Sequence, residues 1–357
     1  MSQSQIGVGI IGASLGQGWA TRSHLPAVSA LPGFRIAAVS TTRQASADET
    51  ARRYGVPHAF DRPEPLIEHP DVQLVVVSVK SMDHASLVRT ALAAGKQVFC
   101  EWPAGTNLAQ TTELASLARA AGVRTIVGLQ GRLAPGVRHV KRLLAEGYIG
   151  TLRSVNITGA LPLLGARRSA AWASTADIAN GANTLHTVTA HFLDPVLFAA
   201  GELASFSALV VRQFSETTLE ETGEVIPVTA PDQVIVAGTL RSGAVLSLRI
   251  EAGKRNGPAL GYTFTGTEGD LALGHDFSLS GARGDHQPLV PIELPPDPSW
   301  PVRGDLSDEA FLTAHLYAGF AVHSPFVPTF DDGVRLRSLL EAFAESSATG
   351  RRVDWST

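Results

Sequence analysis

Short apolar runs separated by helical segments fill the first 130 residues, and they constrain the fold more than any other feature. The runs contain little polar alternation: "IGVGIIGA" (6–13), "RIAAVST" (35–41), "VQLVVVSVK" (72–80), "KQVFCEW" (96–102) and "RTIVGLQ" (124–130). Strands of this kind are buried on both faces, which is typical of a parallel sheet. Because helical segments separate them, we expect a Rossmann-type, doubly wound α/β domain over residues 1–130.

Residues 131–357 have a different pattern. Two stretches of alternating strands, 232–253 and 261–274, predict hairpins, and amphipathic helices are predicted over 136–150 and 331–350. We expect an α+β domain for substrate binding and oligomerisation, with a large, mostly antiparallel sheet that is open on one face. Its last helix is a candidate to pack back on the first domain. An open sheet face favours a homodimer or homotetramer formed through this sheet.

Composition excludes several classes of protein. A net charge of -4 and a pI near 6.3 do not favour nucleic acid or an anionic membrane as a partner. The chain has one cysteine, Cys100, so an internal disulfide and a cysteine-based metal cluster are excluded. No apolar run approaches the roughly 18 residues of a membrane span. The N-terminus has no signal-peptide pattern, and we expect a soluble cytoplasmic protein.

A glycine-rich turn follows the first strand. In "VGIIGASLGQGWA" (8–20), three glycines come directly after the strand: Gly12, Gly16 and Gly18. They allow the backbone to approach a pyrophosphate, whose charge the amides at the next helix start can bind. The spacing differs from the usual G-x-G-x-x-G, but its position after a first strand indicates a dinucleotide site. Ser14 is expected to add a hydroxyl contact, and Trp19 either stacks on the ligand or packs at the domain boundary.

The end of the second strand bears on which dinucleotide is bound. An acidic residue there would bind a ribose 2′-hydroxyl and repel a 2′-phosphate. This chain has "VSTTRQ", with Ser40, Thr41 and Arg43 among its residues. Hydroxyls and a guanidinium suit a phosphate, so NADP is favoured over NAD. In the other interpretation Arg43 is a solvated loop residue and the protein accepts either dinucleotide.

Several segments together resemble one family. They are "VGIIG", "HLPAV", "GKQVFCEWP", "GYIGTLRSV", "FTGTEGDLAL" and "ATGRRV". They look like the glucose–fructose oxidoreductase/inositol dehydrogenase (Gfo/Idh/MocA) family, and "RTIVGLQGRLAP" and "PDQVIVAGTL" are especially similar to its branch with the yeast galactose-pathway repressor. The resemblance implies a dinucleotide-binding domain followed by a substrate domain. Its motifs are specific for the fold and much less so for the function.

The chain departs from the family pattern at two positions. The family usually ends the strand at 96–102 in Glu-Lys-Pro, where the lysine touches substrate and nicotinamide, whereas this chain has Glu101-Trp102-Pro103. The second signature is an Asp four residues before a His. Here His191 is kept, but Thr187 replaces the Asp. Trp102 cannot exchange a proton, so we expect it to line the nicotinamide pocket, to stack on a sugar face of the substrate or to seal the site from water.

Hydride transfer from an alcohol needs a base, and three titratable side chains are candidates. His191 occupies the position that the resemblance marks, and it either exchanges the proton or holds a backbone carbonyl. Lys80 ends a predicted strand, near the cofactor or in solvent. His186 would point about 140° away from His191 on one helix, so a structural role or a substrate contact is expected for it. Thr187 is expected to hydrogen-bond the substrate.

Other residues complete the predicted site. His84 matches a family histidine near the cofactor, or else it packs in the core. Ser78, Glu101 and Gln130 are further cofactor-binding candidates. Arg132 follows the strand at 124–130 and either binds substrate or braces the two domains. Trp172 either forms a wall of the substrate pocket or is an ordinary buried tryptophan. No set of His, Asp and Glu has convincing metal-ligand spacing, so no metal is expected.

These residues favour an NAD(P)-dependent oxidoreductase acting on a hydroxyl or carbonyl of a sugar-like or polyol-like small molecule. The alternative is a non-catalytic NAD(P)-binding regulator, because the family's lysine and aspartate are missing. A third hypothesis is lyase or epimerase chemistry with a recycled cofactor.

Overall fold

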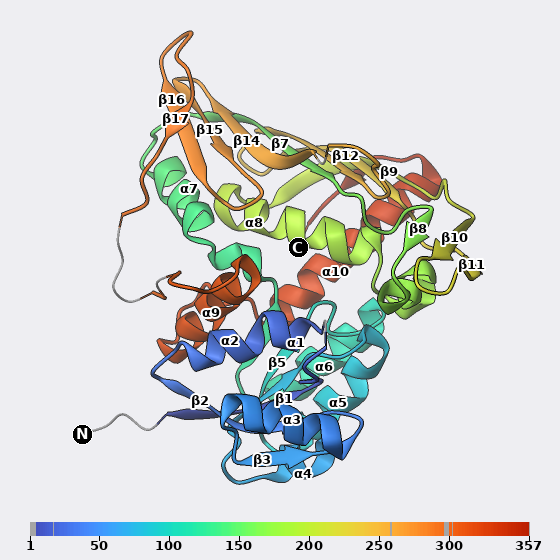
Figure 1. Ribbon diagram of the computed structural model, residues 1–357. Helices are drawn as coiled ribbons and strands as arrows, with labels where there is room; N and C mark the ends of the chain where they lie inside the picture. The colour runs from blue at the N-terminus through green and yellow to red at the C-terminus, as the bar shows by residue number, and fades with distance from the viewer. Residues whose placement is uncertain (1–4, 17, 258, 296–299, 302, 357) are drawn as a thin grey trace. The chain divides into compact units, whose positions relative to one another are not determined.

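The structure is a computed structural model, which describes residues 5–16, 18–257, 259–295, 300–301 and 303–356 (Figure 1). The chain divides into two compact units. Unit 1 comprises residues 1–130 and 297–334, and unit 2 comprises residues 131–296 and 335–357. The segment 297–334 therefore groups with the N-terminal sheet although it follows the hairpins in sequence.

Unit 1 is built on a six-stranded parallel sheet with the order β3-β2-β1-β4-β5-β6. Its strands are β1 (Ile6–Ile11), β2 (Phe34–Ser40), β3 (His58–Phe60), β4 (Leu74–Val77), β5 (Gln97–Glu101) and β6 (Thr125–Gly128). This is the doubly wound order, and it confirms the predicted fold class. All four residues of β4 are buried, as expected for a strand covered on both faces. The edge strand β3 has only three residues and was not predicted.

Helices connect the strands of unit 1 (Figure 1). They are α1 (Trp19–Arg22), α2 (His24–Ser29), α3 (Gln44–Tyr54), α4 (Pro63–Glu68), α5 (Ser81–Ala93) and α6 (Leu108–Ala121), and α9 (Asp308–Ala321) belongs to the later segment of this unit. A 3-10 turn, η1 (Gln130–Leu133), starts at the last residue of the first segment of unit 1 and continues into unit 2. Two of these helices end at a glycine. Gly55 after α3 and Gly122 after α6 have φ of 64° and 65°, the left-handed conformation that glycine adopts without a steric penalty.

Unit 2 contains a nine-stranded sheet with the order β17-β16-β15-β14-β7-β13-β12-β9-β18. Its strands are β7 (Leu152–Ala160), β9 (Leu203–Val211), β12 (Gln233–Leu240), β13 (Val245–Glu251), β14 (Ala259–Gly266), β15 (Gly269–Leu273), β16 (Leu279–Arg283), β17 (Val290–Pro291) and β18 (Val353–Asp354). Both predicted hairpins are present, as β12–β13 and β14–β15. The central pair β7–β13 is parallel and the other pairs are antiparallel. A small sheet joins β8 (Arg167–Arg168), β10 (Glu216–Leu219) and β11 (Val225–Pro227).

Helices cover one face of the nine-stranded sheet, and the other face is open (Figure 1). The helical elements of this unit are α7 (Pro135–Ala145), η2 (Ala170–Ala176), η3 (Ile178–Asn180), η4 (Thr184–Val188), α8 (Thr189–Ala200) and most of α10 (Phe330–Thr349). Phe206 of β9 packs edge-on against Phe343 of α10, with ring centroids 4.7 Å apart. Along β12, Val234 and Val236 are buried, whereas Ile235 is 44% exposed. This period-2 burial is what a one-sided sheet requires.

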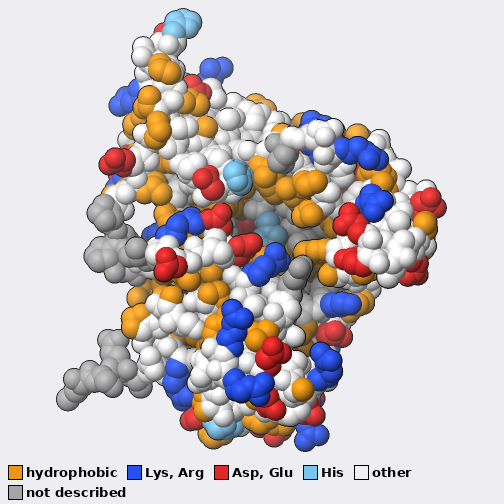
Figure 2. Space-filling model, in the orientation of Figure 1, with side chains coloured by type: hydrophobic (Ala, Val, Ile, Leu, Met, Phe, Trp, Pro, Cys, Tyr) orange, Lys and Arg blue, Asp and Glu red, His pale blue; other side chains and the backbone are white. Residues whose placement is uncertain are grey.

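The surface in view in Figure 2 carries intermixed basic and acidic side chains. This distribution agrees with the small net charge of -4. Among the described helices, none combines the length and the hydropathy that crossing a bilayer would need.

A close backbone contact in unit 1 gives a stability prediction. A Cβ atom at Gly7 in β1 would lie 1.8 Å from the carbonyl oxygen of Asp71, so Gly7→Ala should destabilise the protein by about 3 kcal/mol. Gly33 has no atom within 4 Å of its Cβ position, and Gly33→Ala should change stability by less than about 1 kcal/mol. Urea unfolding measures both values. Equal midpoints for the two variants would contradict the tight packing at Gly7.

Candidate functional site

The glycine turn at the end of β1 is shaped by close contact on one side and open space on the other. Gly12 has φ +88°, and a Cβ there would lie 2.2 Å from the carbonyl oxygen of Ser78. No other residue type fits this position without strain. Gly16 has nothing within 4 Å of its Cβ position, and the nearest atom at Gly18 is the Ser14 carbonyl oxygen at 3.8 Å. The turn therefore leaves room beside its backbone for a ligand. The helix that follows, α1, has only four residues.

Two buried polar atoms of unit 1 lie close to this turn in the chain or in space. Ser78 Oγ and Trp19 Nε1 are buried without a hydrogen-bond partner among the described residues. Buried donors of this kind usually have a hydrogen-bond partner. Two donors that have none among the described residues mark a place where a ligand can supply an acceptor. The Arg22 guanidinium lies 5.6 Å from the centre of the Trp19 ring and covers one face of the indole.

The turn after β2 is preorganised by hydroxyl groups. Thr41 Oγ1 donates to the carbonyl oxygen of Arg43 at 2.8 Å and lies 2.7 Å from Ser46 Oγ. Ser40, the last residue of β2, is buried, and its carbonyl oxygen accepts bonds from the Gly12 and Ala13 amides. The side chain of Arg43 is exposed at the start of α3. Thr41 therefore shapes the turn, and Arg43 is the cation that this turn presents.

Two predicted residues that follow β4 differ in their exposure to solvent. Lys80 is exposed at the start of α5. The His84 ring is buried, with Nδ1 2.8 Å from the Pro103 carbonyl oxygen and Nε2 3.0 Å from the Val79 carbonyl oxygen. Burial lowers the pKa of His84, and these carbonyls act in the opposite direction. Since both ring nitrogens face backbone oxygens, we interpret His84 as a brace between the ends of β4 and β5.

A buried chain of polar side chains ends at Glu101, the last residue of β5. The Tyr317 hydroxyl lies 2.8 Å from His24 Nδ1, and His24 Nε2 lies 2.9 Å from Glu101 Oε1. Gln130 Nε2 donates to both carboxylate oxygens of Glu101 at 3.0 Å. Burial and the charge of Glu101 raise the pKa of Tyr317. Glu101 and Gln130 are thus brought together as predicted candidates, but they bind each other and His24.

Trp102 packs inside unit 1. It is 5% exposed, and a Cβ at Gly333 would lie 3.5 Å from its Cζ3 atom. Thr111 and Val127 border the same space. The edge of the indole therefore packs beside Gly333, Thr111 and Val127, at a position where the family usually has an amine.

A second group of predicted residues lies in unit 2, where a π-helical turn, η4, precedes α8. Asn183 caps this turn: its side-chain oxygen accepts from the His186 amide at 3.0 Å, and its amide nitrogen lies 3.1 Å from His186 Nδ1. Because an amide nitrogen can only donate, Nδ1 accepts and Nε2 carries the proton. Burial and the charge of Arg337 lower the pKa of His186 to about 3. His186 is therefore neutral at physiological pH.

The π-helical turn also changes the relation between His186 and His191. The Thr189 amide bonds the Thr184 carbonyl oxygen, a five-residue step, so the angle expected for a single α-helix does not apply. His191 lies half-buried in α8. Thr187 Oγ1 is buried with no hydrogen-bond partner in the part of the chain that the structure describes. It is available to a ligand that reaches it.

Arg132 and Trp172 have contrasting environments in unit 2. The Arg132 Nε lies 3.1 and 3.0 Å from the two carboxylate oxygens of Asp194, and its terminal nitrogen also contacts that carboxylate. Asp194 is 2% exposed, so this ion pair is largely buried. The guanidinium is thus engaged by Asp194, which lies three residues after His191 in α8. Trp172 lies in η2 and is 45% exposed, so it is not the ordinary buried tryptophan of the alternative interpretation.

Four residues that hydrogen-bond to the predicted site residues, or act on them through charge or through a second residue, were missed in the sequence. They are His24, Tyr317, Asn183 and Arg337. His24 lies in "HLPAV", a segment already recognised by its resemblance, which could have drawn attention to it. Asn183 lies three residues before His186 in a capping position, which is a local signal. Tyr317 and Arg337 are remote in sequence, and no local pattern marks them.

Two family models match consecutive parts of the chain. Residues 6–129 match the model described as an oxidoreductase family with an NAD-binding Rossmann fold. Residues 135–274 match the model of the Gal80p C-terminal domain.

Relatives include both regulators and dehydrogenases. The galactose/lactose metabolism regulatory protein GAL80 of Saccharomyces cerevisiae is 28% identical over 345 residues, which cover 87% of this chain and 78% of that protein. Dehydrogenase aclE of Aspergillus oryzae is 36% identical over 191 residues, 53% of this chain and 52% of that protein.

Solved structures share the fold over the whole chain. A super-repressor mutant of Gal80p from S. cerevisiae has a TM-score of 0.87 at 24% identity and covers 99% of this chain and 100% of its own. Levoglucosan dehydrogenase in complex with NADH and L-sorbose has a TM-score of 0.84 at 22% identity, with the same coverage. At these identities the likeness establishes the fold alone.

The buried, neutral His186 gives a pH prediction. Below about pH 6.5 the histidine takes up a proton in the unfolded chain, whereas in the folded protein its pKa is about 3. On acidification the unfolded state therefore gains protons first, and the free energy of unfolding decreases as the pH decreases between these two values. From pH 7.5 to 5.0 the wild type should lose about 2 kcal/mol more than His186→Gln. Urea unfolding at both pH values measures this difference, and equal losses would exclude the shifted pKa.

Proposed function

The chain belongs to the Gfo/Idh/MocA oxidoreductase family and carries a Gal80-like C-terminal domain, and we propose that it is an NAD(P)-dependent oxidoreductase of a sugar-like or polyol-like substrate. The observation that carries this proposal is the glycine turn at Gly12, Gly16 and Gly18, with one side closed by Ser78 and the other open. The proteins that give the family its name act on sugars and polyols, which motivates the substrate class.

The residues of unit 1 fit a dinucleotide. Ser14, Gly16 and Gly18 line the open side of the turn. The Ser78 hydroxyl and the Trp19 indole N–H, which have no hydrogen-bond partner among the described residues, supply polar contacts. When bound, the nicotinamide supplies a hydride acceptor or donor. The protein's part is to position the ring and to handle the proton that accompanies the hydride.

The turn after β2 favours NADP over NAD. Arg43 is exposed at the start of α3, and Thr41 holds the turn in shape. A guanidinium binds a phosphate monoester through charge-assisted hydrogen bonds, whereas a ribose hydroxyl gains little from it. We propose that Arg43 contacts the 2′-phosphate.

Replacing Arg43 tests the cofactor preference. Arg43→Ala should weaken NADPH binding about tenfold or more, because it removes a charge-assisted bond, and should leave NADH binding nearly unchanged. Titration calorimetry measures both affinities. The control is Arg53→Ala, which removes an exposed arginine from the opposite end of the same helix. An equal loss of affinity for NADPH and NADH would show that Arg43 does not contact the 2′-phosphate.

We assign proton exchange to His191. A histidine titrates near neutral pH and suits this task. His186 is a poor candidate because burial keeps it neutral, so its Nε2–H is instead a hydrogen-bond donor. Thr187 offers its unpaired hydroxyl to the substrate. Lys80 is exposed in unit 1 and is a second candidate for contact with the reacting oxygen. Trp172, 45% exposed, is proposed as an apolar wall of the substrate site.

Replacing His191 tests the enzymatic role. On a substrate that the wild type turns over, His191→Asn should lower kcat by about 10²–10⁴-fold, as expected for loss of a general base or acid. NADPH affinity, measured by calorimetry, should stay the same and serves as the folding control. A variant that retains full turnover would show that another group moves the proton.

A second candidate is a non-catalytic dinucleotide-dependent regulator. The specific observation in its favour is the packed indole of Trp102, 5% exposed, at the position of the family's lysine. The match of residues 135–274 to the Gal80p C-terminal domain supports it as well. In this function the dinucleotide would control binding of a partner protein, and no proton would be exchanged.

Turnover separates the two candidates. Purified protein is mixed with NADPH or NADH and a panel of sugar, polyol and ketone substrates, and absorbance at the nicotinamide band is followed. Steady oxidation or reduction supports the enzyme. Tight dinucleotide binding without any turnover supports the regulator.

We also propose that the open face of the nine-stranded sheet joins copies of this chain. Leu209, Ile235 and Val245 are 51%, 44% and 54% exposed on neighbouring strands. Polar residues beside them are already bonded to one another, as in the 2.6 Å bond between Ser247 and Asn156. Covering such a face with a second copy buries apolar surface and breaks few hydrogen bonds to water. Sedimentation of the purified protein gives the number of chains directly, and a monomer would exclude the proposal.

A further inference from the structure

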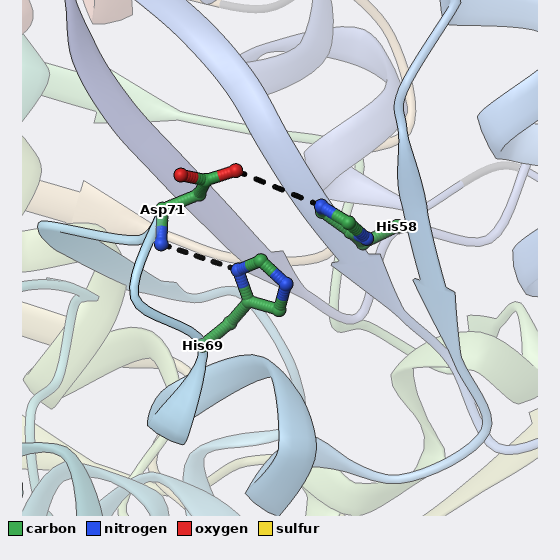
Figure 3. A group of neighbouring side chains, drawn as sticks. All are labelled: His58, His69 and Asp71. Carbon is green, nitrogen blue, oxygen red and sulfur yellow. Dashed lines mark hydrogen bonds and ion pairs between the residues drawn. The ribbon is translucent and has the colours of Figure 1, made fainter.

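Three potential metal ligands converge in unit 1 away from the glycine turn (Figure 3). His58 is the first residue of β3, His69 follows α4, and Asp71 lies in the loop before β4. One ligand atom from each residue lies within 4.8 Å of the others. Sequence spacing did not reveal this group, because a helix separates His58 from the other two.

The orientation of the three side chains suits metal binding. His58 Nε2 lies 3.7 Å from Asp71 Oδ2, and the Asp71 amide donates to His69 Nδ1 at 3.2 Å, so both imidazoles face Asp71 (Figure 3). Because His69 Nδ1 accepts, the ring proton is on Nε2 and the Nδ1 lone pair is directed at the Asp71 amide, next to the Asp71 side chain. The rings of His58 and His69 lie 3.9 Å apart between centroids.

The loop that carries two of these ligands is held in place by its neighbours. The Lys96 ammonium donates to the carbonyl oxygens of His69 at 3.0 Å and Val72 at 2.8 Å. The guanidinium of Arg35 lies 3.5 Å from Asp71 Oδ1, the oxygen that does not face His58. A second residue that orients a ligand carboxylate is a common feature of metal sites. The backbone is thus fixed, and the partly exposed side chains can adjust.

We propose that His58 Nε2, His69 Nδ1 and Asp71 Oδ2 bind one zinc ion. Two imidazoles and a carboxylate form a ligand set that zinc accepts, with water in the fourth position. Ligand atoms about 2.0–2.1 Å from a tetrahedral ion lie roughly 3.3 Å apart. The side chains therefore have to close inward by small rotations, and the ion replaces the 3.2 Å contact of the Asp71 amide with His69.

The position in the sheet indicates what the ion does. His58 begins β3, and Arg35 lies in the first part of β2, so the group is at the amino edge of the sheet. Gly12, Ser40 and Ser78 are at the carboxyl edge. The ion would therefore join the short edge strand β3 to the loop before β4 and stabilise unit 1, without reaching the glycine turn.

Calorimetric titration of zinc chloride into untagged, EDTA-treated and desalted full-length protein tests this proposal. The wild type should bind one zinc ion per chain at this site. His58→Gln and His69→Gln should each weaken binding at least tenfold, since each removes a ligand. His275→Gln, which changes an exposed histidine in unit 2, should bind as the wild type does.

Thermal unfolding gives a second readout. Zinc should raise the midpoint of the wild type and of His275→Gln, and should leave the His58 and His69 variants unchanged. Midpoints in EDTA show that all variants are folded. The proposal fails if the wild type takes up no zinc at submillimolar concentration, or if the His58 and His69 variants retain its affinity and its midpoint shift.

Discussion

The Glu101 carboxylate is the constraint around which unit 1 is arranged. A largely buried carboxylate is stable only when other groups bind its oxygens, and here His24 and Gln130 do so. Tyr317 in turn bonds His24. The chain of contacts therefore joins β5 to α2, to the end of β6 and to α9, four elements remote in sequence. It fixes the end of β5 and, with it, the position of Trp102.

The candidate site is better equipped to bind a dinucleotide than to move a proton. Open backbone at Gly16 and Gly18 favours binding, as does the Ser78 hydroxyl, which has no partner in the described part of the chain. His186 is held neutral by burial and by Arg337, and an indole occupies the place of an amine. An enzyme with these residues has fewer titratable groups for proton transfer than the family pattern provides. A regulator would need no group for proton transfer.

Much of the fold could be predicted because its signals are local. Apolar runs predicted the parallel sheet, amphipathic patterns predicted helices, and alternating stretches predicted both hairpins. β3 was missed because three half-buried residues carry no periodicity. The site was predicted less completely. Its candidates came from strand ends and motifs, but the roles of Arg132 and His84 depend on partners, Asp194 and the Pro103 carbonyl, that no local pattern connects with them.

The sequence by itself determined the doubly wound sheet, the glycine turn after β1 and the loss of the lysine and aspartate at Trp102 and Thr187, because these depend on residue type and short-range spacing. The tertiary structure alone decided which polar groups are engaged and which are unpaired. It paired Arg132 with Asp194, left Thr187 Oγ1 without a partner in the described chain, and buried His186 beside Arg337. The physical reason is that desolvation and hydrogen bonding depend on neighbours brought together by folding, and not on neighbours in sequence.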